Sequence, residues 1–260
     1  MALIIIGLAA GLASALTLFS GFGLGTVLAP VFALFFPVPL AVAATAVVHF
    51  ANNLFKLALL AHQADWWVVA RFGVPAALAA LIGASLLTEF DRLPPLVEYQ
   101  LAGAMHEITA VKAVIGLLII VFAGLELSPR VQSWAVPARY LPLGGALSGF
   151  FGGLSGNQGA LRSAFLIRLG LSKKAFVATG VVSAVIVDVS RLLVYGTGFL
   201  AEQFSRSQEL MLPVAVGAGC AFAGVVIGKR FLQKVTLRAV QRIVAGMLLL
   251  VGGGLVTGLI

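Results

Sequence analysis

The chain has 260 residues, of which 61% are hydrophobic and only 10% are charged. A typical soluble domain carries about 25% charged residues, so this composition excludes a soluble globular protein. It predicts an all-α polytopic membrane protein instead. We attribute the formal net charge of +8 to basic cytoplasmic loops and expect no nucleic-acid partner. The single cysteine, Cys220, excludes an internal disulfide.

Long apolar stretches follow one another along almost the whole chain. In order they cover 3–20, 26–36, 40–61, 68–87, 110–126, 139–172, 174–195, 210–228 and 243–260. The first stretch lacks the basic flank of a cleaved signal peptide, so we expect it to be retained. The mixed segment 88–109 contains Pro94-Pro95, a candidate start for an amphipathic helix on the surface.

A glycine-dense run interrupts the apolar stretch 139–172. Residues 152–159 contain four glycines, and each glycine costs a helix interior about 1 kcal/mol relative to alanine. Because apolar sequence flanks the run on both sides, we place this break at membrane depth, where protein or a water-filled cavity must satisfy the free amides. A broken helix followed by a basic residue, here Arg162, is typical of an anion site in a transporter.

The two halves of the chain resemble each other. A glycine break near residue 21 and the sequence 41–45 (AVAAT) match a second break near residue 152 and the sequence 175–179 (AFVAT). A shift of about 135 residues places Asn53 on Asp188 and Lys56 on Arg191. We therefore expect one transmembrane domain, 1–260, built from two four-segment repeats. The halves cover about 1–127 and 139–260, each with a glycine-broken first helix.

Charge distribution favours repeats of inverted topology. Residues 88–112 hold four acidic and two basic side chains, whereas the matching segment 228–242 holds five basic side chains and no acidic one. Basic loops lie in the cytoplasm, so we place the second segment inside and the first outside. The stretches 139–172 and 3–36 would then be re-entrant hairpins. Eight full spans with parallel halves remain the alternative topology.

The glycine breaks supply the first candidates for substrate binding. Free amides at a turn and at the start of a helix favour an anion, and Arg162 would add charge. Arg162 has an alternative role, because its side chain could instead reach the cytoplasmic surface as a topology signal. The candidates at the breaks are Gly153, Ser155, Gly156, Asn157, Gln158 and Arg162 in the second half, with Gly23 and Gly25 in the first half.

Polar side chains inside the long helices supply the other candidates. Asp188 and Arg191 are one helical turn apart, so they share a face. Ionisable residues within spans are costly and usually functional. We assign this pair to coupling or gating, with a self-neutralising structural pair as the alternative. In the matching helix of the first half, His49, Asn53 and Lys56 are candidates for substrate binding, and an unperturbed histidine titrates near neutral pH.

We found no support for an enzyme or a metalloprotein. Residues 153–156 read GLSG, which resembles the serine motif of rhomboid intramembrane proteases. A nucleophilic serine needs a base, and in that family the histidine follows the serine. All three histidines of this chain precede Ser155. Cysteine and histidine residues also lack metal-ligand spacing, so we predict no catalytic residues, no metal and no cofactor.

The two glycine breaks, each followed by a VAT-type helix start, resemble the TauE/SafE family of sulfite exporters. The matching residues are 21–25 with Pro30 and 43–45 in the first half, and 149–159 with 177–179 in the second half. The family pattern is commonly G-x-G-G-G. This chain departs from it, with GLG at 23–25 and SGNQG at 155–159. The resemblance implies a fold of two such halves and a substrate such as sulfite, sulfoacetate or thiosulfate.

These observations predict a secondary transporter of a small sulfur-containing anion, with sulfite export by alternating access as the first choice. The alternatives are an anion channel, or an importer of another small organic anion such as sulfoacetate, thiosulfate or a carboxylate. The expected partners are the small anionic substrate and the lipid bilayer of a bacterial inner membrane, which the chain would cross several times. The oligomeric state stays open, with a homodimer as one arrangement.

Overall fold

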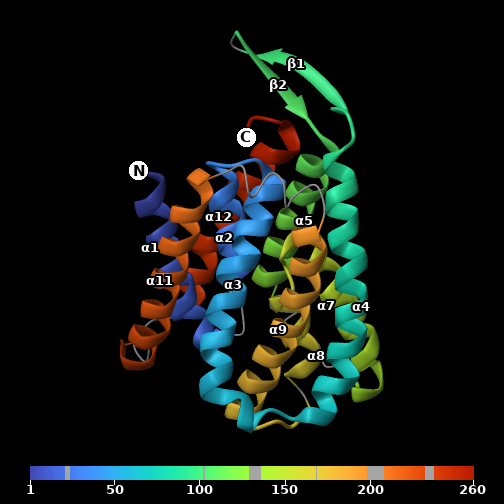
Figure 1. The fold of residues 1–260 in the computed structure, drawn as a ribbon, viewed down its shortest axis with the longest axis vertical. Coiled ribbons are helices and arrows are strands. Elements are labelled where there is room, and N and C mark those ends of the chain that lie inside the picture. Colours follow the sequence, from blue (N-terminus) through green and yellow to red (C-terminus); the bar gives the residue numbers. More distant parts are fainter. Residues whose placement is uncertain (21–23, 102, 129–135, 168, 198–207, 232–236) are drawn as a thin grey trace.

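A computed structural model describes residues 1–20, 24–101, 103–128, 136–167, 169–197, 208–231 and 237–260. It shows a bundle of helices with one two-stranded hairpin that projects from one end (Figure 1). The elements are α1 (Ala2–Ser20), α2 (Leu24–Ala33), α3 (Val38–Leu60), η1 (Ala61–Gln63), α4 (Trp66–Asp91), β1 (Val97–Leu101), β2 (Ala104–Ile108), α5 (Ala110–Leu127), η2 (Ala138–Tyr140), α7 (Leu141–Ser155), α8 (Gly159–Leu166), α9 (Lys173–Thr197), α11 (Gln208–Phe231) and α12 (Leu237–Thr257).

The helices have the length and surface of an integral membrane protein. Within the described residues, four helical segments are long and apolar enough to cross a bilayer: Val38–Gln63, Trp66–Asp91, Lys173–Thr197 and Glu209–Gly228. Large apolar side chains cover the outside of the bundle, including Leu78 and Leu250, which are 61% and 79% exposed. Hydrocarbon surroundings accept such a surface, whereas water does not. The membrane class predicted from composition is confirmed.

The bundle has two distinct ends (Figure 1). The N-terminus, the C-terminus and the hairpin β1–β2 lie together at one end, which we call the hairpin end. The α3–α4 connection, which contains η1, lies at the opposite end, which we call the η1 end. The start of α9 also lies at the η1 end, because the Asp65 amide donates a hydrogen bond to Thr179 Oγ1 at 2.9 Å.

Helices from the two halves of the chain pack against each other in pairs. The largest contacts join α4 to α7, α1 to α11, α5 to α12, α4 to α9 and α3 to α9. The polar network described below lies where α3 and α9 cross, close to the turn between α7 and α8. The interior of the bundle is therefore built from residues far apart in the sequence.

Glycines allow α7 to approach α4 very closely. Cβ atoms built at Gly149 and Gly153 would lie 2.0 Å and 2.2 Å from the carbonyl oxygens of Ala76 and Ala80. Both residue pairs are spaced by four, so the two helices run in the same direction. Without a hydrophobic driving force between helices in lipid, such small-residue contacts are what hold spans together.

The same kind of contact joins α1 to α11. A Cβ atom built at Gly224 would lie 2.2 Å from the carbonyl oxygen of Gly11, and one at Gly228 would lie 2.9 Å from that of Ala15. The two helices are again parallel, since position 224 faces position 11 and position 228 faces position 15. The first helix of each half, α1 or α7, therefore packs against a helix of the other half.

The segment 88–109 is not a surface helix. Helix α4 continues to Asp91, and the chain then forms the antiparallel strands β1 and β2, in which Tyr99 pairs with His106. Alternation of apolar and polar residues over 97–101 (VEYQL) is the period of a strand rather than of a helix. Gly103 has φ +84° in the connecting turn, a conformation that favours glycine. The expectation of a helix starting at Pro94-Pro95 was wrong.

We predict that Gly149→Ala destabilises the fold. The added methyl group would meet the Ala76 carbonyl and force α4 away from α7, and overpacking of this kind costs about 1–3 kcal/mol. Thermal unfolding in detergent should show a lower transition temperature than for the wild type. Gly219→Ala on α11 is the matched control, because a Cβ atom there meets nothing within 4 Å. Equal transition temperatures for the two variants would contradict the packing argument.

Candidate functional site

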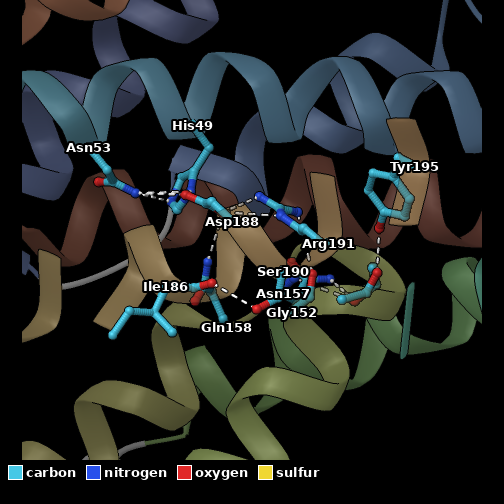
Figure 2. Close-up of polar contacts among 12 residues, drawn as sticks. His49, Asn53, Gly152, Asn157, Gln158, Ile186, Asp188, Ser190, Arg191 and Tyr195 are labelled. Carbon is cyan, nitrogen blue, oxygen red and sulfur yellow. Dashed lines mark hydrogen bonds and ion pairs between the residues drawn. The ribbon is translucent and has the colours of Figure 1, made fainter. Parts of the chain in front are cut away.

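Asp188 is the centre of a buried network between α3, α9 and the turn that joins α7 to α8 (Figure 2). Its Oδ1 accepts hydrogen bonds from Arg191 Nη2 at 2.7 Å, Arg191 Nε at 3.1 Å and Gln158 Nε2 at 3.3 Å. Its Oδ2 accepts from His49 Nδ1 at 2.6 Å and from Asn53 Nδ2 at 3.1 Å. We assign the Nδ1 proton to His49 because that nitrogen faces the carboxylate. The carboxylate is thus saturated with donors, as a buried charge requires.

Arg191 and Tyr195 also hold the end of α7 (Figure 2). Arg191 Nη1 donates to the carbonyl oxygen of Gly152 at 3.4 Å, and the Tyr195 hydroxyl donates to that of Gly153. The last carbonyl groups of a helix lack their usual partners within the helix, and a bilayer interior supplies no water for them. The Gly152 carbonyl oxygen also accepts from the Gly156 amide at 3.0 Å. These two side chains of α9 therefore stabilise the break between α7 and α8.

Polar side chains also shape the turn itself. Gly156 has φ +81°, a conformation that favours glycine. Ser155 Oγ accepts a hydrogen bond from Asn157 Nδ2 at 3.2 Å, and Ser148 Oγ donates to the carbonyl oxygen of Gln158 at 2.9 Å. Helix α8 then starts at Gly159. The turn is buried throughout and rigidly positioned against α9.

Gly25 brings the first half of the chain to the same place. A Cβ atom built at Gly25 would lie 2.9 Å from the carbonyl oxygen of Gly156 and 3.9 Å from His49 Cδ2. The first turn of α2 therefore abuts the turn between α7 and α8, and a side chain at Gly25 would separate them. Gly23, the other candidate of the first break, lies outside the described residues.

Two further cations lie in the interior without an acidic partner. Lys56 is 6% exposed and Arg162 is 9% exposed. Arg162 Nη1 donates to Gln158 Oε1 at 3.2 Å, and within the described part of the chain Lys56 has no hydrogen bond or ion pair. A Cβ atom built at Gly180 of α9 would lie 3.5 Å from Arg162 Nε, so this guanidinium lies about as far toward the η1 end from Asp188 as Lys56 lies from His49. Asp188 is the only buried acid among the described residues, and its donors already saturate it.

Unpaired hydrogen-bonding groups lie on the same face of α3 as Lys56. Thr45 Oγ1 and Asn52 Nδ2 are buried and have no hydrogen-bond partner among the described residues, although Asn52 Oδ1 accepts from Ser14 Oγ at 3.1 Å. At about 100° per residue, one third of the helix circumference holds Thr45, His49, Asn52, Asn53 and Lys56. This face therefore combines a positive charge with donors that no protein acceptor uses.

The structure brings most of the predicted site residues together. The buried set, in chain order, is Gly25, His49, Asn53, Lys56, Gly153, Ser155, Gly156, Asn157, Gln158, Arg162, Asp188 and Arg191. Gly153 packs against the backbone of α4. Its carbonyl oxygen accepts the hydrogen bond from the Tyr195 hydroxyl. Within the described residues, no group of three or more potential metal ligands occurs.

Three side chains of this region, Ser148, Asn52 and Tyr195, were not predicted from the sequence. Ser148 lies within the largely apolar helix α7, and Asn52 is the neighbour of the predicted Asn53. Tyr195 follows Arg191 by four residues and therefore shares its helix face, which was a usable signal. The partners of these side chains belong to other helices, and no local pattern indicates them.

We predict that Asp188→Asn destabilises the protein strongly. The variant would leave the buried Arg191 guanidinium without its counter-charge, and removal of one partner from a buried ion pair costs about 3–5 kcal/mol. Glu89→Gln is the matched control, because Glu89 and Arg92 have the same i,i+3 spacing but have side chains 61% and 52% exposed. Its effect should stay within about 0.5 kcal/mol. Thermal unfolding in detergent measures both, and similar shifts would contradict a dominant role for the buried pair.

Comparison with known proteins gives one match. The family model described as "Sulfite exporter TauE/SafE" covers residues 3–255, nearly the whole chain. No curated protein and no solved structure matched the chain. The family consists of membrane transporters of sulfur anions such as sulfite. Together with the apolar helices, this match shows that the chain belongs to the sulfite exporter TauE/SafE family.

Proposed function

We propose that this protein is a secondary transporter that exports sulfite, or a closely related small sulfur oxyanion, by alternating access. The observation that carries the proposal is the pair of buried cations, Lys56 and Arg162, which have no acidic partner among the described residues. A cation without a counter-charge is costly at low dielectric. An anion bound between these side chains would remove that cost.

The groups around the two cations suit an oxyanion. Arg162 presents a planar set of N–H donors that matches the oxygen atoms of such an anion. Asn52, one helical turn before Lys56, has a buried amide group with no acceptor among the described residues. The first amides of α8 follow the turn at Gly159, and a helix N-terminus favours negative charge. Ser155 and Asn157 would complete the binding site from the turn.

Helix pairing supports two interlocked repeats, 1–127 and 139–260. Helix α1 of the first half lies along α11 of the second half, and α7 of the second half lies along α4 of the first half. The contact between Asn53 and Asp188, which occupy matching positions, joins α3 to α9 at 3.1 Å. Exchange of the two halves thus reproduces the pattern of contacts, as expected for transporters built from repeats.

Helix directions support inverted repeats with re-entrant hairpins. Helix α1 starts at the hairpin end (Figure 1). Helix α7 runs parallel to α4, which starts at the η1 end. The segments α1–α2 and α7–α8 would then enter the bilayer from opposite sides and meet at Gly25 and Gly156. Six spans, formed by α3, α4, α5, α9, α11 and α12, would complete the multi-pass topology.

Surface charge supports an orientation with the η1 end in the cytoplasm of a bacterial cell. The hairpin end carries Glu89, Asp91, Glu98 and Glu107 against Arg92 and Lys112. Among the described side chains, the η1 end carries Arg71, Arg139, Lys173 and Lys174 against Asp65. Basic residues favour the inside face of the membrane. In this orientation Lys56 and Arg162 lie on the cytoplasmic side of Asp188.

Export is the direction that the membrane potential favours. Each negative charge that moves outward gains about 2.3 kcal/mol per 100 mV when the inside is negative, so export needs no coupled ion. Asp188, Arg191 and His49 join α3, α9 and the turn after α7. A switch of the binding site from facing the cytoplasm to facing the outside would have to rearrange these contacts. We therefore assign Asp188 and Arg191 to gating, with His49 as the group through which protons would act.

We predict saturable sulfite transport by the purified protein in liposomes. A rapid jump in sulfite concentration should produce charge movement or uptake. Arg162→Ala should lower the initial rate at subsaturating sulfite by about tenfold or more, because a charged hydrogen bond to a ligand contributes about 1.5–3 kcal/mol. Arg92→Ala, at the exposed hairpin end, is the control and should behave as the wild type. Sulfate, chloride and a carboxylate serve as comparators.

Other results of the same measurement would contradict the proposal. Large unitary currents without saturation would indicate an anion channel. A rate that is unchanged in Arg162→Ala would exclude this anion site. If the folded protein responds to none of the sulfur anions, sulfite export is wrong for this member of the family.

We predict a specific labelling pattern for the proposed topology. In a Cys220→Ala background, single Arg139→Cys and Lys174→Cys variants should react with a membrane-impermeant maleimide only from the cytoplasmic side, because a re-entrant hairpin returns to the side it entered. A Glu98→Cys variant should react from the outside. Labelling of Arg139→Cys and Lys174→Cys from opposite sides would show that α7 and α8 cross the membrane, and the re-entrant topology would be wrong.

A further inference from the structure

The interior of the protein holds more positive than negative charge. Among the described side chains, the buried cations are Lys56, Arg162 and Arg191, and the only buried acid is Asp188. Arg191 is neutralised by Asp188 through two hydrogen bonds. With His49 neutral, Lys56 and Arg162 therefore leave two positive charges without compensation inside the bundle.

We propose that the site selects a doubly charged anion, so that the transported species is the fully ionised sulfite dianion or another sulfur dianion. This inference rests on the proposed function and deepens it by naming the charge of the substrate. A dianion would neutralise both Lys56 and Arg162. A monoanion would leave one positive charge uncompensated in surroundings where an isolated charge is costly.

Charge compensation distinguishes a dianion from a monoanion in this site. The cost of removing an ion from water grows with the square of its charge, whereas its attraction to the site grows with the product of the two charges. With two excess positive charges, the attraction to a dianion is twice that to a monoanion, and only the complex with the dianion is neutral. Charged N–H donors replace the water that the dianion loses.

The placement of the cations allows one ligand to contact both. Lys56 follows His49 by seven residues along α3 and shares its helix face. Arg162 lies beyond the turn in α8 and is held by Gln158, whose amide bridges Arg162 and Asp188. Arg162 lies beside Gly180 of α9, where an added Cβ atom would be 3.5 Å from the Arg162 Nε, eight residues toward the η1 end from Asp188. Lys56 lies seven residues toward the same end from His49, which bonds Asp188. The two cations therefore lie at a similar depth on neighbouring helices. One small anion between them would meet the ammonium group and the guanidinium group at once.

The donor inventory agrees with a multiply charged oxyanion. A guanidinium has five N–H donors and an ammonium has three. Within the described residues Arg162 uses one donor, on Gln158, and Lys56 uses none. An oxyanion with several charged oxygen atoms can accept many of the remaining donors. A halide or a singly charged acid would leave more of them unpaired.

Methanesulfinate provides the matched probe for substrate charge. It keeps the pyramidal sulfur atom of sulfite but carries a methyl group in place of one charged oxygen. At mildly alkaline pH, sulfite is doubly ionised and methanesulfinate carries a single charge. Binding to the purified protein, followed by thermal stabilisation, and transport in liposomes would be measured for both anions. We expect the wild-type protein to prefer sulfite by about tenfold or more.

Lys56 variants separate charge from shape. Lys56→Met removes one excess charge at similar volume, so the preference for sulfite over methanesulfinate should fall at least tenfold. Because the ligand-free protein loses an uncompensated charge, its transition temperature should stay the same or rise. Lys56→Arg keeps the charge and should keep the preference. Lys112→Met, at the hairpin end, controls for a general effect of lysine removal.

Each outcome decides the inference. Equal binding and transport of the two anions by the wild-type protein would overturn selection of a dianion while sulfur-anion transport would stand. An unchanged preference in Lys56→Met would also overturn it, because the charge count would not set selectivity. If neither anion binds or moves, the proposed function itself fails and the inference falls with it. Loss of the preference in Lys56→Met alone, with Lys56→Arg unaffected, supports it.

Discussion

The need to satisfy one buried carboxylate organises the centre of this protein. Asp188 has no exposed surface, and an isolated ionised group in such surroundings would cost many kcal/mol. Its donors come from α3, from α9 and from the turn after α7. These three segments are therefore held in one geometry, because displacement of any of them leaves part of the charge unpaired. The same geometry leaves Lys56 and Arg162 without an acid, and that imbalance makes an anion the missing component.

Close glycine packing is what allows a broken helix to lie in the interior. Glycines of α7 lie against the backbone of α4, and α1 meets α11 in the same way. The short helix α8 buries Gly159, Arg162 and Leu166. The turn before it is held by neighbours, through Arg191 and Tyr195 on the final carbonyl groups of α7. Irregular backbone is thus permitted because other protein groups take the place of water.

Prediction from sequence succeeded where the signal was local and strong. Apolar length and low charge indicated the membrane class and the main helices, because a bilayer imposes a minimum length and hydropathy on a span. The hairpin after α4 was missed, since Pro94-Pro95 was given more weight than the alternation of residues over 97–101. Ser148 and Tyr195 were missed because their partners are carbonyl groups of other segments, which no side-chain pattern reveals.

Composition, glycine runs and rare ionisable residues within spans indicate the class of protein, the family and the residue types of the candidate site without any coordinates. Which charges cancel one another follows from helix packing alone. In the sequence, Lys56, Arg162 and Arg191 are all cations within apolar segments. Only Arg191 is near enough to Asp188 in the chain, at a spacing of three residues, for an ion pair to be predicted. The fold adds His49, Asn53 and Gln158 to Asp188. It leaves Lys56 and Arg162 without an acidic partner among the described residues. The net charge of a site depends on which side chains lie close together in space, and helix packing determines this.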